Sequence, residues 1–215
     1  MTDTEAFIRA HTAPTFPPAC PEIELYLASE ITPLWHATEE FLAANNLPPP
    51  YWAFPWVGGQ GLARHILDNP DLVAGQRVLD FAAGCGIVAI AAAKAGAAEV
   101  EAAEIDDMAI AAIALNAAAN GVSVGLSSEN VLEMEECPWN VIFAGDVCYE
   151  KPMAEKVFAW MRRCSRAGAR VMMADPGRAY LPTTGLMRIG QLTVACSLEL
   201  EDRESRDVGI YQIVG

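Results

Sequence analysis

The segment from Val78 to Gly86 carries the clearest chemical signal in the sequence. It reads Val-Leu-Asp-Phe-Ala-Ala-Gly-Cys-Gly, an apolar run that passes directly into a glycine-containing turn. Glycine at positions 84 and 86 allows a sharp turn, and it lets a ligand approach the backbone where a Cβ atom would block it. A loop of this kind, between a strand and a helix, is where a doubly wound α/β sheet binds its nucleotide.

The glycines alone do not identify the nucleotide, because Gly84-x-Gly86-x-x-Ala89 also satisfies the dinucleotide fingerprint. Asp80 favours S-adenosylmethionine (SAM) over NAD. A carboxylate at the strand end would face the pyrophosphate of NAD unfavourably, whereas SAM has no phosphate and has an ammonium group at its methionine end. Ala82, inside the turn, belongs to the same predicted cofactor loop.

Three further positions are predicted to contact the cofactor. Glu104 closes the second predicted strand, about 20 residues after the glycines, where an acid accepts hydrogen bonds from ribose hydroxyls. Asn130 and Val131 follow the third strand, where a polar side chain and a backbone amide are placed at the adenine edge. The alternatives are a surface acid at Glu104 and an ordinary loop residue at Asn130.

The residues predicted to act on the methyl acceptor follow the fourth strand. Asp146 and Tyr149 fall across the switch point of the sheet from the glycine loop. Asp146 is predicted to hold an incoming amine and Tyr149 to wall its channel. The alternatives are a turn residue and a packing aromatic. Val147-Cys148 lacks the prolines of the adenine N6 methyltransferase motif, so chemistry on a nucleobase amine is disfavoured.

An aromatic segment before the glycine loop is a second candidate for the acceptor side. Trp52, Phe54 and Trp56 alternate through a proline-rich stretch, and Trp56 is predicted to lie nearest the methionine end of SAM. The alternative is that all three aromatic residues pack the N-terminal extension onto the sheet. Backbone donors around Gly59 are predicted at the start of the following helix. Arg178 is predicted on the same rim, where it orients an acidic flank of the substrate; a solvated turn arginine is the alternative.

The elements that position these residues alternate between short apolar runs and helical stretches, which predicts βαβ units and a parallel sheet. The predicted strands cover 77–81, 99–103, 122–126, 140–144, 170–174, 192–200 and 209–214, and the predicted helices cover 58–67, 86–95, 107–120 and 152–166. The last two strands are predicted to form an antiparallel hairpin at the sheet edge. A helix over 4–11, a strand over 22–28 and a helix over 34–44 precede them.

Composition limits the function classes. The 215 residues, 53% of them hydrophobic, fit one α/β domain (57–215) with an N-terminal extension and aromatic loop (1–56). The six cysteines form no CxxC pair and the three histidines are scattered, so no metal site is predicted. A formal net charge of −14 disfavours nucleic acid and favours basic partners, although acidity that serves only solubility is an alternative. With neither a signal peptide nor a long apolar run, we expect a cytoplasmic monomer that does not bind membranes.

Several motifs together resemble one family. They are Pro50 to Gln60 (PYWAFPWVGGQ), Leu67 to Pro70 (LDNP), the Asp80 to Gly86 loop, Gly145 to Tyr149 (GDVCY) and Asp175 to Arg178 (DPGR). The chain resembles the seven-β-strand methyltransferases of family 16, most closely the electron transfer flavoprotein β-subunit lysine methyltransferases and their bacterial relatives. The Ala82-Ala83 pair departs from the Gly or Ser that relatives often carry.

The resemblance implies a Rossmann-like, seven-stranded class I SAM methyltransferase fold with strand order 3-2-1-4-5-7-6 and the seventh strand antiparallel. It implies a D-x-x-Y motif at Asp146 and Tyr149. The cofactor contacts that it implies come from the following residues: Trp56, Gly59, Asp80, Ala82, Gly84, Gly86, Glu104, Ile105, Asn130, Val131 and Asp146. On the substrate side it implies Trp52, Tyr149 and Arg178.

The resulting expectation is a SAM-dependent protein-lysine N-methyltransferase that releases S-adenosylhomocysteine. Its implied substrate is a lysine in a basic loop of the electron transfer flavoprotein β subunit. Another basic protein, such as a ribosomal one, or a small amine such as nicotinamide remains an alternative acceptor. An NAD-linked oxidoreductase is disfavoured by Asp80, and a catalytically silent module is disfavoured by the presence of both Asp80 and Asp146.

Overall fold

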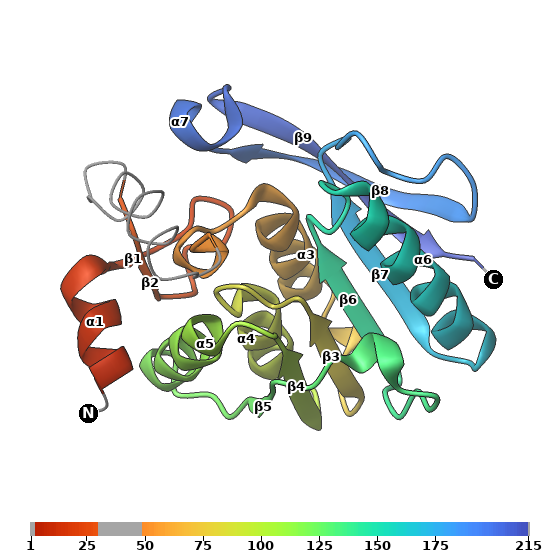
Figure 1. The fold of residues 1–215 in the computed structure, drawn as a ribbon, viewed down its shortest axis with the longest axis horizontal. Helices are drawn as coiled ribbons and strands as arrows, with labels where there is room; N and C mark the ends of the chain where they lie inside the picture. Colours follow the sequence, from red (N-terminus) through yellow and green to blue (C-terminus); the bar gives the residue numbers. More distant parts are fainter. Residues whose placement is uncertain (1–2, 30–48, 215) are drawn as a thin grey trace.

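A seven-stranded sheet forms the centre of the molecule. The computed structural model describes residues 3–29 and 49–214. The strands of the sheet are β3 (Arg77–Phe81), β4 (Glu99–Ala103), β5 (Gly125–Ser127), β6 (Val141–Gly145), β7 (Arg170–Asp175), β8 (Leu186–Ala195) and β9 (Ser205–Ile213). Their order is β5-β4-β3-β6-β7-β9-β8, and β9 alone in this order is antiparallel to both of its neighbours (Figure 1). Counted from β3, this is the expected order 3-2-1-4-5-7-6.

Helices cover both faces of the sheet. Helices α3 (Val57–Asp68), α4 (Ile87–Lys94) and α5 (Asp107–Ala119) share one apolar core with alternate residues of the strands, among them Val78 and Phe143. Helix α6 (Lys151–Arg166) packs on the other face, against Leu79 and Ile142. Because successive strand residues point to opposite faces, the nearly unbroken apolar runs of β3 and β6 serve both cores. None of the helices in the described part of the chain is long and apolar enough to span a membrane.

Helix starts follow from local chemistry. The Asp106 side chain accepts a hydrogen bond from the Met108 backbone at 2.9 Å and so caps α5. Pro152 lies in the first turn of α6, where its missing N–H costs nothing.

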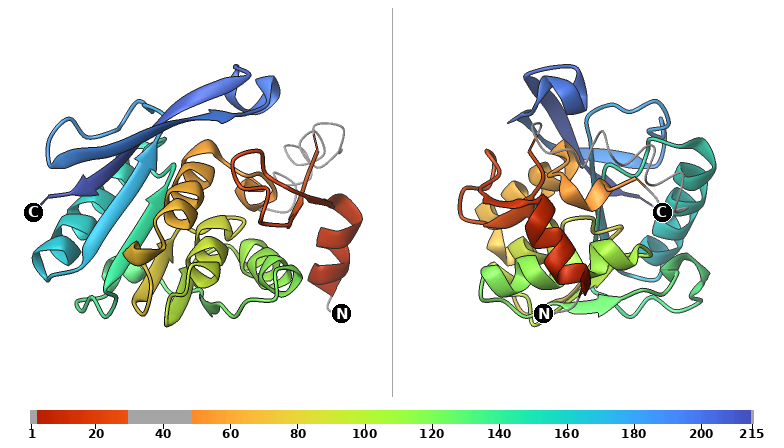
Figure 2. Two further views of the ribbon diagram at one scale, coloured as in Figure 1. Left: turned by 180° about the vertical axis from the view of Figure 1, so that it is seen from behind. Right: turned by 60° about the vertical axis from the view of Figure 1, so that its left-hand side comes forward.

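The N-terminal extension packs on α5. It contains α1 (Asp3–His11) and a small sheet of β1 (Ala13–Thr15) and β2 (Leu25–Leu27), and Figure 2 shows it at the end of the molecule opposite the C-terminus. Asn116 of α5 is fully buried and links the glycine loop to the N-terminal extension. Its side chain donates to the carbonyl of Cys85 at 2.9 Å and accepts from the Tyr26 amide at 2.7 Å. The predicted helix over 34–44 lies outside the described residues.

The predicted C-terminal hairpin is confirmed, but its first strand was placed wrongly. The expected strand over 192–200 is β8, which begins at Leu186 and ends at Ala195, and a short helix α7 (Leu198–Glu201) follows it. β8 is an edge strand whose first half is largely exposed on both faces, so it lacks the apolar alternation that marks a strand. The third strand also differs, since β5 covers only Gly125–Ser127.

Candidate functional site

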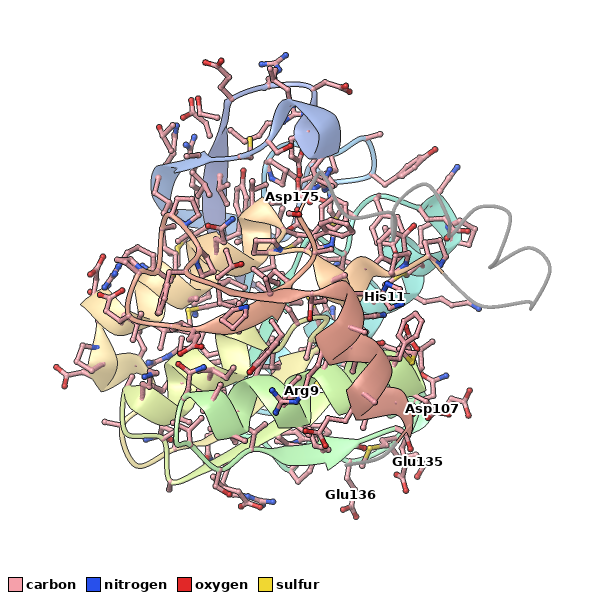
Figure 3. All side chains as sticks on the ribbon, turned by 90° about the vertical axis from the view of Figure 1, so that its left-hand side faces the viewer. Arg9, His11, Asp107, Glu135, Glu136 and Asp175 are labelled. Carbon is pink, nitrogen blue, oxygen red and sulfur yellow. The ribbon has the colours of Figure 1, made fainter. Side chains whose placement is uncertain are left out.

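The carboxyl ends of the parallel strands meet at one edge of the sheet. There β3 leads into the glycine loop, β4 into Glu104, β6 into Asp146 and β7 into the turn after Asp175. Figure 3 looks at the molecule from the side that carries α1 and labels Asp175 below the β8–β9 hairpin. Parallel α/β sheets bind their ligands at this edge.

The glycine loop adopts the backbone conformation that glycine permits. Gly84 and Gly86 have φ angles of 53° and 79°, and Ala82 also has a positive φ of 52°. A Cβ atom at Gly86 would lie 2.9 Å from the Ile113 side chain, so this glycine is needed for packing against α5. A Cβ at Gly84 would meet nothing within 4 Å, which leaves open space over the loop for a ligand.

Asp80 is buried beneath the glycine loop and does not reach the surface of the loop. Its side chain is 2% exposed, and Oδ2 accepts a hydrogen bond from the Ala89 amide of α4 at 2.9 Å. Burial raises the pKa of Asp80 to about 7. The predicted direct pairing with the SAM ammonium is therefore replaced by a role in holding the loop and the start of α4.

Glu104 lies against the glycine loop, and its predicted contact with ribose hydroxyls stays a prediction. Its Oε2 accepts from the Gly84 amide at 3.1 Å and its Oε1 from the Ile105 amide at 2.8 Å. The neighbouring Ile105 side chain is 76% exposed, which is unusual for a large apolar residue next to a loop of this kind. An acid beside the turn and an open apolar surface suit a ribose and an adenine ring, respectively.

The residues after β5 make contacts within the chain. The Asn130 side chain accepts from the Leu132 amide at 3.3 Å and donates to Glu133 at 2.7 Å, so it caps the short helix η3 (Val131–Glu133). The side chain of Val131 is buried against the α6 face of the sheet. Contact with adenine at these two positions stays a prediction.

Asp146 makes contacts within the chain, and its predicted role at the acceptor amine stays a prediction. Oδ2 accepts from the amides of Gly58 and Gly59 at 2.6 and 3.2 Å, and Oδ1 accepts two hydrogen bonds from Arg178, at 3.0 and 2.7 Å. The residue is 8% exposed and has a positive φ of 57°. Its carboxylate is thus already occupied, and so are the donors of Gly58 and Gly59 that were expected to face the cofactor. Asp146 fastens the start of α3 to the end of β6.

Burial and charge oppose each other at Asp146. Burial raises its pKa to about 6, while the Arg178 guanidinium lowers it. Arg178 itself is held from two sides, since its Nη2 also donates to Glu201 of α7 at 2.7 Å. The Glu201 side chain is 3% exposed and pairs with Arg206 at 3.2 Å as well. Arg178 is therefore part of an internal ion-pair network and is not the solvated turn arginine of the alternative; its predicted contact with the substrate stays a prediction.

Three aromatic side chains lie together beside the end of β6. Tyr149 and Tyr51 are 44% and 41% exposed, and their ring centroids are 5.6 Å apart. Trp56 lies 5.9 Å from Tyr51, donates its Nε1–H to the Tyr51 carbonyl at 2.9 Å and has the Arg178 guanidinium 5.8 Å from its ring centroid. Trp56 and Tyr149 thus both contact Tyr51, while the predicted contacts of Trp56 with SAM and of Tyr149 with the acceptor stay predictions.

The predicted substrate contact at Trp52 is wrong. Trp52 and Phe54 are each 3% exposed and pack with Ile8 and the first turns of α5. Their alternation reflects the packing of the extension, which was the alternative interpretation. Tyr51, Glu201 and Asp175 were not among the residues predicted for the site. Tyr51 and Asp175 lay inside quoted motifs, whereas nothing local to Glu201 signals its partners.

Comparisons with known proteins agree with this arrangement. Residues 64–146 match the model of the ribosomal protein L11 methyltransferase family. The electron transfer flavoprotein beta subunit lysine methyltransferase of Xenopus laevis is 38% identical over 205 residues, which cover 94% of this chain and 82% of the relative.

Two solved structures share the fold. The magnesium protoporphyrin IX methyltransferase of Synechocystis, solved with bound S-adenosylhomocysteine, superposes with a TM-score of 0.52 at 15% identity and covers 72% of this chain and 81% of its own. The ribosomal protein L11 methylase of Lactobacillus delbrueckii gives a TM-score of 0.50 at 21% identity, with 72% and 77% of the two chains covered.

Proposed function

The chain belongs to the family of electron transfer flavoprotein β-subunit lysine methyltransferases, and we propose that it methylates a lysine of the electron transfer flavoprotein β subunit. It is a SAM-dependent methyltransferase with a class I fold. The observation that carries the acceptor assignment is the likeness over 94% of the chain, which includes both the cofactor loop and the acceptor side.

The cofactor side of the structure suits SAM. The open space over Gly84 accommodates the approach of the methionine part to the backbone, and Glu104 lies where ribose hydroxyls bind. The exposed Ile105 offers an apolar surface to the adenine. Bound SAM would supply an activated methyl group on a sulfonium sulfur, with the neutral thioether as the leaving group. Methyl transfer from SAM therefore requires neither a redox group nor a phosphate-binding residue at this site.

The acceptor side has to deliver an uncharged amine. A lysine side chain has an unperturbed pKa of about 10.4, so it is protonated at neutral pH and must lose a proton before it attacks. The rings of Tyr51, Trp56 and Tyr149 offer an apolar entrance, and removal of water disfavours the ammonium form. Asp146 and Arg178 hold α3, and with it Trp56, against the ends of β6 and β7.

A protein acceptor also fits the charge of the chain. With a formal net charge of −14, the molecule attracts a basic surface loop and repels a phosphate backbone. The match to the ribosomal L11 methyltransferase family ends at residue 146, before Tyr149 and Arg178. It therefore supports the cofactor half of the site and says nothing about the acceptor half.

The test is methyl transfer with purified components. The protein is incubated with the β subunit and methyl-labelled SAM, and labelled peptides are identified by mass spectrometry. Label on a lysine of the β subunit, and its loss when that lysine is replaced by arginine, is the expected result. Label that appears only on ribosomal protein L11 or on nicotinamide, supplied in parallel reactions, would contradict the proposed acceptor.

A further inference from the structure

Asp175 and Asp146 lie side by side at the acceptor end of the sheet. Ala174 of β7 pairs with Gly145 of β6, and the Asp146 amide donates to the Ala174 carbonyl at 3.1 Å. The next residue on β7 is Asp175. Two carboxylates therefore follow two neighbouring parallel strands at the same level, and only one of them, Asp146, has both oxygens occupied by nitrogen donors.

The two oxygens of Asp175 have different surroundings. Oδ1 accepts from the amides of Gly177 and Arg178 at 2.7 and 2.6 Å, which fixes the turn after β7. Oδ2 is buried and accepts no nitrogen or hydroxyl hydrogen bond from residues 3–29 and 49–214. The Cys148 thiol interacts with the Asp175 carboxyl group, but a thiol is at most a weak donor. One oxygen thus serves the turn and the other lacks a strong partner.

An unpaired buried carboxylate oxygen is uncommon because it loses its water without gaining a donor. The whole residue is 1% exposed, and burial raises the pKa of Asp175. Arg178 does not supply the missing donor to Oδ2, because its Nε and Nη2 donate to Asp146 and Glu201. The oxygen is best explained by a donor that arrives from outside the chain.

We propose that Asp175 Oδ2 receives the amine of the substrate lysine and orients it for methyl transfer. The inference rests on the proposed function, in which a lysine enters at the ends of β6 and β7. An amine is a nitrogen donor of the kind that Oδ2 lacks.

The position also suits the charge that develops during the reaction. The amine, already free of its third proton, donates one N–H to Oδ2 and keeps its lone pair for the methyl carbon. As the C–N bond forms and the C–S bond breaks, the electron pair goes to sulfur and positive charge develops on nitrogen. A carboxylate shielded from water stabilises that charge more strongly than one in solvent.

The test is the Asp175→Asn variant, because asparagine keeps an oxygen for the two turn amides and removes the charge. We expect kcat/KM for the lysine-bearing β subunit to fall at least about tenfold, the loss typical of one charge-assisted hydrogen bond. SAM affinity by calorimetry and the melting temperature should stay close to those of the wild type. Asp71→Asn, at an exposed position, removes the same charge far from the site and controls for altered encounter with a basic substrate.

A second variant separates the amine contact from the turn. Gly177 has a positive φ of 87°, so Gly177→Ala strains the turn and leaves the carboxylate in place. A larger fall in kcat/KM in Asp175→Asn than in Gly177→Ala supports the proposal. Equal losses in the two variants, or kcat/KM in Asp175→Asn within about twofold of the wild type, would overturn it. If the wild type itself does not label the β subunit, the proposed function fails instead.

Discussion

At the scale of single residues, Gly84 can be compared with Gly168, another glycine that has a positive φ angle. Gly84 and Gly168 both have positive φ angles, 53° and 104°, and a Cβ at either would meet nothing within 4 Å. Valine at either position strains the backbone. Only at Gly84 does it also fill the space over the cofactor loop.

We therefore expect Gly84→Val to weaken SAM binding at least tenfold, or about 1.4 kcal/mol, relative to Gly168→Val. Calorimetric titration of both variants with SAM measures the difference. Equal affinities would show that the space over Gly84 is not used by the cofactor.

Asp80 gives a prediction about stability and pH. Burial raises its pKa to about 7, above the value of about 3.9 for an exposed aspartate. Between these values the folded chain binds more protons than the unfolded chain, so this group lowers the free energy of unfolding as pH rises from about 4 to 7. The full destabilisation is present above pH 7 and is absent below about pH 4.

Asp80→Asn removes this ionisation and keeps an acceptor for the Ala89 amide. We expect the free energy of unfolding of the variant to decline less between pH 4 and 7 than that of the wild type. Urea titrations at several pH values measure both curves. Parallel curves would mean that Asp80 is already ionised throughout this range.

At the scale of elements, the β8–β9 hairpin is fastened to the site through Glu201. The Glu201 side chain is 3% exposed, and its carboxylate pairs with Arg178 at 2.7 Å and with Arg206 at 3.2 Å. Removal of one partner from a buried ion pair costs about 3–5 kcal/mol, because the remaining charges stay buried.

Glu201→Gln should accordingly destabilise the protein by a few kcal/mol and increase amide hydrogen exchange first in β8 and β9. Arg188→Gln changes an exposed charge on the same hairpin and is the matched control. Unchanged exchange of the hairpin in Glu201→Gln would mean that β8 and β9 are held by their strand pairing alone.

The same elements show how far the sequence could predict the structure. The glycine loop, Glu104 and the strand order were predictable because each rests on a local pattern or on a family motif. The partners of Asp146 were not, since Gly58 lies 88 residues away along the chain. Trp52 was misassigned for a related reason: alternation of aromatic residues is the same whether they face a ligand or a neighbouring helix.

At the scale of the whole molecule, the charge distribution connects the site to its proposed substrate. Figure 3 labels Asp107, Glu135 and Glu136 in the view onto the α1 side, and all three are exposed. Glu150, beside Tyr149, is exposed as well. Exposed acidic residues therefore lie on more than one part of the surface, where they attract a basic loop.

The final prediction follows from that attraction. Exposed charges act over about 30 Å at 0.01 M salt and about 8 Å at 0.15 M, so added salt should lower kcat/KM for the β subunit. Because salt affects mainly the encounter, kcat at saturating substrate should change much less. The rate should also rise from pH 7 to 9, as more of the lysine loses its proton. Steady-state assays with saturating SAM measure both trends, with nicotinamide as the control acceptor. Flat salt and pH profiles with the β subunit would contradict a basic, lysine-bearing substrate, because a small neutral acceptor is neither steered by charge nor protonated in this range.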